Sequence, residues 1–129
     1  MKSFENKYCR LSIEDGILHF IYKPELSLTL DDAKVIVADR IKFQEGVTYP
    51  VYCDFRGVLK GEKEARDYLA NEGSALISVV ALQISSPVMK VILNFYLNIS
   101  SPKVPTHAFT SKEEALKFLN KHKRHIASV

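Results

Sequence analysis

Acidic and basic residues follow directly after an apolar, β-prone run at residues 49–53, and the basic ones can bind an anion. Asp54 and Arg56 close this run, and Lys60 and Lys63 come soon after. Two glycines and a predicted helix start lie among them, so backbone amides and cations together can bind an anion. Our favoured interpretation, however, is an Asp54–Arg56 charge pair beside a mobile, lysine-rich loop. The candidate anion or partner site consists of Asp54, Arg56, Gly57, Lys60, Gly61 and Lys63.

Catalytic patterns are missing from the chain. Its four histidines show no HExxH or other metal-ligand spacing. There is no nucleophile elbow, and the negative charge of Asp54 disfavours a thiolate at the neighbouring Cys53. The anion site also lacks the GxxxxGK[ST] spacing of a phosphate loop. We therefore expect no enzyme, no catalytic residues, no metal and no cofactor.

Length and composition are typical of one globular domain, residues 1–129. Hydrophobic residues make up 47% and charged residues 26% of the chain. The net charge of +3 is spread out, apart from a basic cluster at residues 117–125. A solvated helix end explains this cluster, and recruitment to anionic membranes is an alternative that salt would abolish. Interleaved basic and aromatic residues are missing, so no nucleic acid is expected.

Cysteine usage and the N-terminal sequence bear on localisation. Cys9 and Cys53 lie in apolar, strand-like sequence without CxxC spacing. Reduced, buried thiols are expected, and a disulfide between neighbouring strands is the alternative. The N-terminal residues lack the apolar core of a signal peptide. No apolar stretch approaches the ~20 residues of a membrane-spanning helix. These features predict a cytoplasmic protein without stable membrane insertion.

Strands and helices are predicted to alternate along the chain. Asp15-Gly16 separates two alternating runs and indicates a hairpin, because both residues tolerate positive φ. Thr29 is a candidate N-cap, and Gly46 a candidate helix stop. Alternating strands and helices favour a mainly parallel sheet. The predicted elements are strands 8–13 and 17–22, a helix between Thr29 and Gly46, a strand through Cys53, a loop at Gly57–Lys63, a helix at 64–72, a central strand at 75–84, a helix at 87–99, an edge strand at 106–109, and a final helix after a capping box at 110–113.

The helix predicted at 87–99 is apolar on nearly every side. Ser86 and Pro87 are typical of an N-cap and a first helical position. An all-round apolar helix is buried, covers a ligand cavity or forms an interface. Packing against a second copy or a partner is our favoured interpretation, with core packing and a cavity as alternatives. The candidate interface or cavity residues are Val88, Ile92, Phe95, Tyr96 and Ile99.

The predicted order of elements resembles the STAS domain, with VYCDFRGV at 51–58 in its middle and FTSKEEALKFL at 109–119 near its end. The chain is similar in particular to small stand-alone STAS-like, SEC14-like proteins of bacteria. This resemblance implies an α/β, STAS-like (SpoIIAA-like) fold with about four to five strands and about four helices. Anti-sigma factor antagonists of this class carry an Asp and then a phosphorylatable Ser after the central strand. Asp54 and Gly57 match, but residues 59–64 contain no Ser or Thr.

The resemblance and the apolar helix together suggest a function. We expect a non-enzymatic, STAS-like regulatory or protein-interaction module that forms a homodimer and docks a regulatory protein. The alternative is a small-ligand or lipid-binding protein with an apolar cavity under the 87–99 helix. Charging Phe95 or Tyr96 should dissociate the oligomer in the first case. In the second case it should abolish ligand retention without changing the mass of the assembly.

Overall fold

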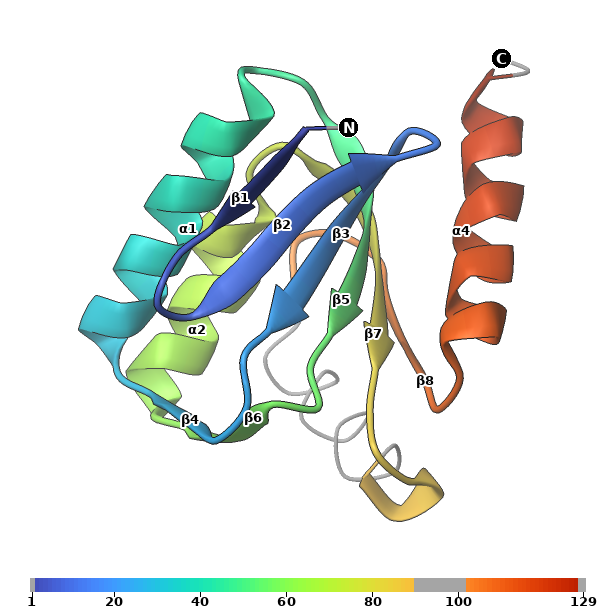
Figure 1. The fold of residues 1–129 in the computed structure, drawn as a ribbon. Helices are drawn as coiled ribbons and strands as arrows, with labels where there is room; N and C mark the ends of the chain where they lie inside the picture. Colours follow the sequence, from blue (N-terminus) through green and yellow to red (C-terminus); the bar gives the residue numbers. More distant parts are fainter. Residues whose placement is uncertain (1, 90–101, 128–129) are drawn as a thin grey trace.

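A six-stranded sheet forms the centre of the computed structural model, which describes residues 2–89 and 102–127 (Figure 1). The strand order is β1-β2-β3-β5-β7-β8. The first three strands are antiparallel neighbours, and β3, β5, β7 and β8 are parallel. The strands are β1 (Ser3–Glu5), β2 (Cys9–Glu14), β3 (Ile17–Tyr22), β5 (Tyr49–Asp54), β7 (Ile77–Gln83) and β8 (Thr106–Phe109).

Helices cover both faces of this sheet, which gives three layers. On one face lie α1 (Leu30–Gln44) and α2 (Lys63–Asn71), and on the other lies α4 (Lys112–Ala127) (Figure 1). A 3-10 turn, η1 (Glu72–Ser74), follows α2. Two short strands, β4 (Leu26–Leu28) and β6 (Val58–Gly61), pair with each other in a separate parallel ribbon.

Each face of the sheet has its own apolar core, because β3, β5 and β7 carry apolar side chains on both sides. The core under α1 and α2 includes Leu18 and Phe20 of β3, with Ile36 of α1. The core under α4 includes Val79 of β7 and Leu119 of α4. Two cores in a chain of 129 residues bury the sheet on both faces, as parallel sheets require.

Turn and cap signals in the sequence correspond to the observed geometry. Asp15 and Gly16 have φ angles of 52° and 74°, which are left-handed values suited to a tight hairpin. At the start of α1, the Asp32 amide donates to Thr29 Oγ1 at 3.2 Å, and the Thr29 amide donates to Asp32 Oδ2 at 2.9 Å. This capping box confirms Thr29 as the N-cap. Helix α1 ends in two left-handed residues, of which Gly46 is the second.

The remaining predicted elements need correction in number and in position. The sheet has six strands rather than four to five, because β1 adds an edge beside β2. The predicted loop at Gly57–Lys63 contains β6, which pairs with β4. The N-cap of α4 is Ser111, whose Oγ accepts from the Glu114 amide at 3.3 Å, so the capping box predicted from Thr110 lies one residue early.

The predicted 87–99 helix is described only at its beginning. Pro87–Met89 is helical, and Ser86 Oγ accepts a hydrogen bond from the Met89 amide at 3.2 Å, which confirms the predicted N-cap. Ile92, Phe95, Tyr96 and Ile99 lie outside the described residues. Within the described ranges, no helix is both long and apolar enough to cross a membrane.

Candidate functional site

The carboxylate of Asp54 at the end of β5 is held by Arg56. Its oxygens accept hydrogen bonds from Arg56 Nε at 2.9 Å, Nη2 at 2.7 Å and the Arg56 amide at 3.1 Å. The Asp54 side chain is 11% exposed and that of Arg56 is 52% exposed. A buried carboxylate needs such a charged, bidentate partner. The two residues therefore form the charge pair that was favoured from the sequence.

The electrostatics keep both members of this pair ionised at neutral pH. Burial alone would raise the pKa of Asp54, but the side-chain and backbone hydrogen bonds from Arg56 outweigh it and hold that pKa below its usual value. The hydrogen bond to Asp54 raises the pKa of Arg56 in turn. The Asp54 carboxylate is therefore already neutralised by a group of its own chain.

Gly57 brings the chain after β5 close against the end of β3. A Cβ atom at position 57 would lie 2.1 Å from the carbonyl oxygen of Lys23. The Gly57 carbonyl also accepts from the Leu26 amide at 2.9 Å, next to the β4–β6 ribbon. Only glycine permits this approach, so Gly57 fixes the position of β6.

The two lysines predicted for the anion site differ in their contacts. Lys63 pairs with Asp67 at 2.9 Å on the exposed side of α2. Lys60 lies in β6, and its side chain has no hydrogen-bond or ion-pair partner among the residues that the structure describes. Lys60 and Gly61 line a cavity together with Arg56, and Lys63 is not among the residues that line it.

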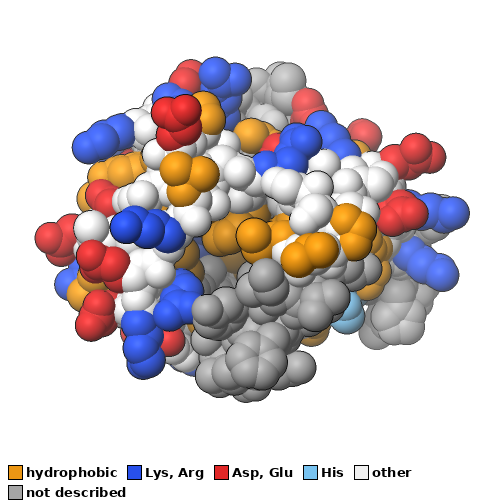
Figure 2. Space-filling model, turned by 90° about the horizontal axis from the view of Figure 1, so that it is seen from below, with side chains coloured by type: hydrophobic (Ala, Val, Ile, Leu, Met, Phe, Trp, Pro, Cys, Tyr) orange, Lys and Arg blue, Asp and Glu red, His pale blue; other side chains and the backbone are white. Residues whose placement is uncertain are grey.

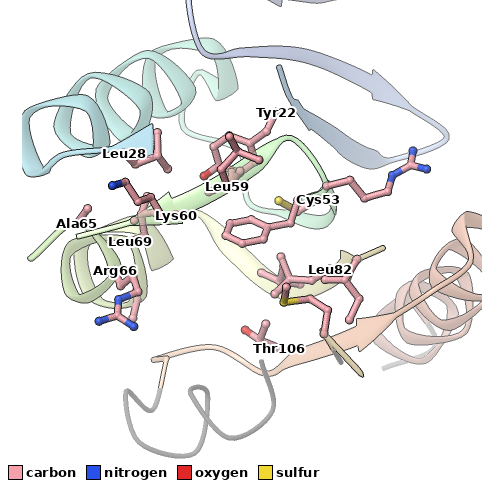
Figure 3. Close-up of a pocket in the computed structure, with 18 of the residues that line it drawn as sticks. Tyr22, Leu28, Cys53, Leu59, Lys60, Ala65, Arg66, Leu69, Leu82 and Thr106 are labelled. Atoms are coloured by element: carbon pink, nitrogen blue, oxygen red, sulfur yellow. The ribbon is translucent and has the colours of Figure 1, made fainter. Parts of the chain in front are cut away.

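This cavity, of about 490 Å³, lies between β6, α2 and the carboxyl ends of β5 and β7 (Figure 3). Small-molecule sites in proteins have volumes of this order. Hydrophobic side chains occupy the central hollow in Figure 2, and Lys and Arg side chains border it. The apolar residues that line the cavity are Tyr22, Leu28, Cys53, Phe55, Val58, Leu59, Ala65, Leu69, Ala70, Val80, Leu82, Ile84, Met89 and Pro102.

The charged residues at the cavity are all basic. Arg56, Lys60 and Arg66 line it, and none of its described lining residues is acidic. Lys60 and Arg66 lie on the side formed by β6 and α2, with Leu82 and Thr106 opposite them (Figure 3). The site therefore combines an apolar interior with a positively charged border. Sequence reasoning identified Arg56, Lys60 and Gly61 but missed Arg66, which carried no local signal.

Cys53 and Tyr22 are buried in the cavity wall, and each could act as a nucleophile or a base only in its deprotonated form. Burial, followed by the nearby charge of Asp54, raises the pKa of the Cys53 thiol far above its usual value. Burial likewise raises the pKa of Tyr22. Cys9 lies in the same core, and burial raises its pKa to about 12; both cysteines are free. These groups stay protonated at neutral pH and are poor catalysts.

Helices on both faces of a mainly parallel sheet make this an α/β protein, and its fold is SpoIIAA-like. A DUF3478-family protein from Shewanella loihica PV-4, described as uncharacterized with a SpoIIAA-like fold, matches 90% of this chain and 98% of its own. The TM-score is 0.64 and the identity 14%, which confirms the predicted class at the level of the fold.

The chain belongs to the protein family described as a domain of unknown function, DUF7793, which matches residues 11–123. A protein of unknown function from Arthrobacter sp. FB24 is 27% identical, over 84% of this chain and 90% of its own, with a TM-score of 0.33. Comparison with curated proteins gives no match.

Proposed function

We propose that this protein is a non-catalytic binding module that holds an apolar small molecule in the cavity beside β6 and α2. The observation that carries this proposal is the cavity of about 490 Å³ itself, with its mostly apolar lining. An apolar ligand that enters this cavity removes its apolar lining from water, which favours binding. The protonated state of Cys53 and Tyr22 supports binding rather than catalysis.

Self-association is the second candidate function, and exposed apolar side chains near the cavity favour it. Leu59 and Met89 line the cavity and are 69% and 46% exposed, and the adjacent Val88 is 71% exposed. Exposed apolar residues that lie together often mark an interface. In this form the protein would be a STAS-like interaction module without the phosphorylation switch, since residues 59–64 contain no hydroxyl side chain.

Fluorescence of N-phenyl-1-naphthylamine, a neutral apolar probe, tests the proposed cavity. The wild-type protein should bind the probe saturably at one site. Ala70→Phe places a ring in the cavity and should weaken probe binding about tenfold or more, since it fills space that the probe needs. Ala38→Phe, at an exposed position of α1, is the matched control and should bind like wild type.

Circular dichroism of each variant checks that it is folded. If Ala70→Phe fails to fold, Thr106→Phe fills the cavity from the opposite side. Absence of saturable binding by wild type, or equal binding by both alanine variants, would refute the cavity as a site. Native mass spectrometry of the wild type then separates the two candidates. A monomer with a retained added mass favours ligand binding, and a ligand-free dimer favours the interaction module.

A further inference from the structure

We infer that the ligand of this cavity is a single-chain amphiphile with an anionic head group, a carboxylate or a phosphate. This inference rests on the proposed function and adds the chemical class of the ligand. Two properties of the same site lead to it: an apolar interior and a border whose charges have one sign.

The charges around the cavity favour an anion at one side of it. Lys60 has no partner among the described residues, so its ammonium group is available to a ligand. Arg66 lies beside Gly61, the residue after Lys60, because the Cγ of Arg66 is 3.6 Å from where a Cβ of Gly61 would be. Arg56 also lines the cavity, although Asp54 already engages its guanidinium. A head group at the β6–α2 side would therefore meet Lys60, with the positive charges of Arg66 and Arg56 along the same border.

Nearby acids do not cancel this positive border. Glu62 and Glu64 at the start of α2 are exposed and do not line the cavity. Asp54 accepts three hydrogen bonds from Arg56 and is neutralised by it. Lys60 and Arg66 are both exposed, so they attract an anionic ligand at the border of the cavity, where salt screens the attraction.

The apolar interior indicates the chemistry of the part of the ligand that lies beyond the head group. Val80, Leu82 and Ile84 form part of the cavity wall, and the described polar side chains are few, Ser85 and Thr106 among them. A sugar or a base would leave its polar groups unpaired here, at a large cost. Each methylene of an alkyl chain gains about fourfold in affinity when it is buried. A hydrocarbon chain can pack against this apolar wall, and an anionic head group can pair with the ammonium group of Lys60.

Competition against N-phenyl-1-naphthylamine tests the inference with three ligands of equal chain length, each kept below its micelle concentration or, for the alcohol, below its solubility limit. Dodecanoate and dodecyl phosphate carry the proposed head groups, and dodecanol is the neutral counterpart. In wild type, at least one of the two anions should displace the probe about tenfold more strongly than dodecanol does. Raised salt should reduce this difference, since it screens the attraction.

Lys60→Gln removes the charge of the lysine that has no described partner and keeps a polar side chain of similar length. Binding of the preferred anion should weaken about five- to tenfold, while dodecanol binding stays unchanged. Lys34→Gln, at an exposed position of α1, is the matched control and should change neither. Selective loss in Lys60→Gln supports the inference, and the preferred anion identifies the head group.

Three results would overturn the inference, and they point to different errors. Equal displacement by anions and dodecanol, unchanged in Lys60→Gln, would reject the anionic head group but leave the proposed apolar site intact. If anion binding weakens equally in Lys60→Gln and Lys34→Gln, the anion is attracted by the overall positive charge of the protein and not by a head-group site at Lys60. Failure of wild type to bind the probe or any of the three ligands would refute the proposed function together with the inference.

Discussion

Replacing Asp54 with Asn should destabilise the protein by about 2 kcal/mol at neutral pH. The substitution keeps the size of the side chain but removes the charge that accepts from Arg56 Nε and Nη2 at 2.9 and 2.7 Å. It also places an amide NH₂ group next to the guanidinium donors. Since the Asp54 side chain is 11% exposed, water cannot fully replace the lost hydrogen bonds.

The size of this effect follows from the burial of the two partners. Exposed ion pairs contribute about 0–1 kcal/mol, and breaking a fully buried pair costs about 3–5 kcal/mol. Asp54 is buried but Arg56 is 52% exposed, so the freed guanidinium can be solvated. The expected loss of about 2 kcal/mol lies between these limits and leaves a domain of ordinary stability folded.

The pH dependence of this effect has a definite sign. Asp54 has a pKa below its usual value in the folded state, because the hydrogen bonds from Arg56 outweigh the effect of burial. A carboxyl group of this kind stabilises the fold fully above its unfolded pKa of about 3.9, and this contribution disappears as the pH falls through the folded pKa. The stability difference between wild type and Asp54→Asn should therefore be largest at neutral pH and should shrink below about pH 4.

Urea unfolding followed by circular dichroism at pH 7 and pH 3 measures both effects. Asp15→Asn is the matched control, because Asp15 is exposed and its left-handed conformation suits Asn equally well. A loss of about 2 kcal/mol should move the midpoint by about 1 M urea. Equal midpoints for the two variants at pH 7, or a wild-type advantage over Asp54→Asn that is unchanged at pH 3, would refute the assigned role of the Asp54–Arg56 pair.

Two further substitutions test how the site is positioned. Gly57→Ala places a Cβ 2.1 Å from the Lys23 carbonyl oxygen, so it should cost about 3 kcal/mol or more, whereas Gly73→Ala makes only ordinary contacts near 3.7 Å and should cost less than about 1 kcal/mol. Thermal unfolding of both compares them, and similar melting temperatures would contradict the close approach. Arg40, which is 3% exposed, donates to two backbone carbonyls at 2.9 and 3.1 Å and to Gln44, so Arg40→Leu should lose about 2–4 kcal/mol in urea unfolding. A loss below about 1 kcal/mol would show that these acceptors find other partners.

Elements with strong local signals were predictable from the sequence. The hairpin turn at Asp15-Gly16 and the N-cap at Thr29 depend on nearby residues only, and both are observed. The edge strand at 106–109 has the predicted bounds. Strands β1, β4 and β6 were missed because three or four residues carry no usable periodicity, and their pairing partners lie elsewhere in the chain. At α4, adjacent Thr110 and Ser111 are both good N-caps, so sequence alone chose the wrong one.

The candidate site was predictable only in its charged part. Asp54 and Arg56 are two residues apart at a strand end, so their pairing follows from local geometry. The apolar wall was not predictable, because Ala65 of α2 and Val80 of β7 have the same residue types as any packed core. A cavity arises from the spacing of elements, and no periodic pattern distinguishes a residue that lines a space from one that fills it.

The fold explains why apolar space and positive charge meet at this place. On one face of the sheet α4 contacts β5, β7 and β8, whereas on the other face α1 and α2 pack against each other. The cavity lies beside α2 at the carboxyl ends of β5 and β7, where parallel sheets commonly bind ligands. Asp54 ends β5 at the same edge, and it engages Arg56 through both Nε and Nη2. Because Arg56 is partly neutralised in this way, Lys60 is the cation whose removal most directly tests anion binding.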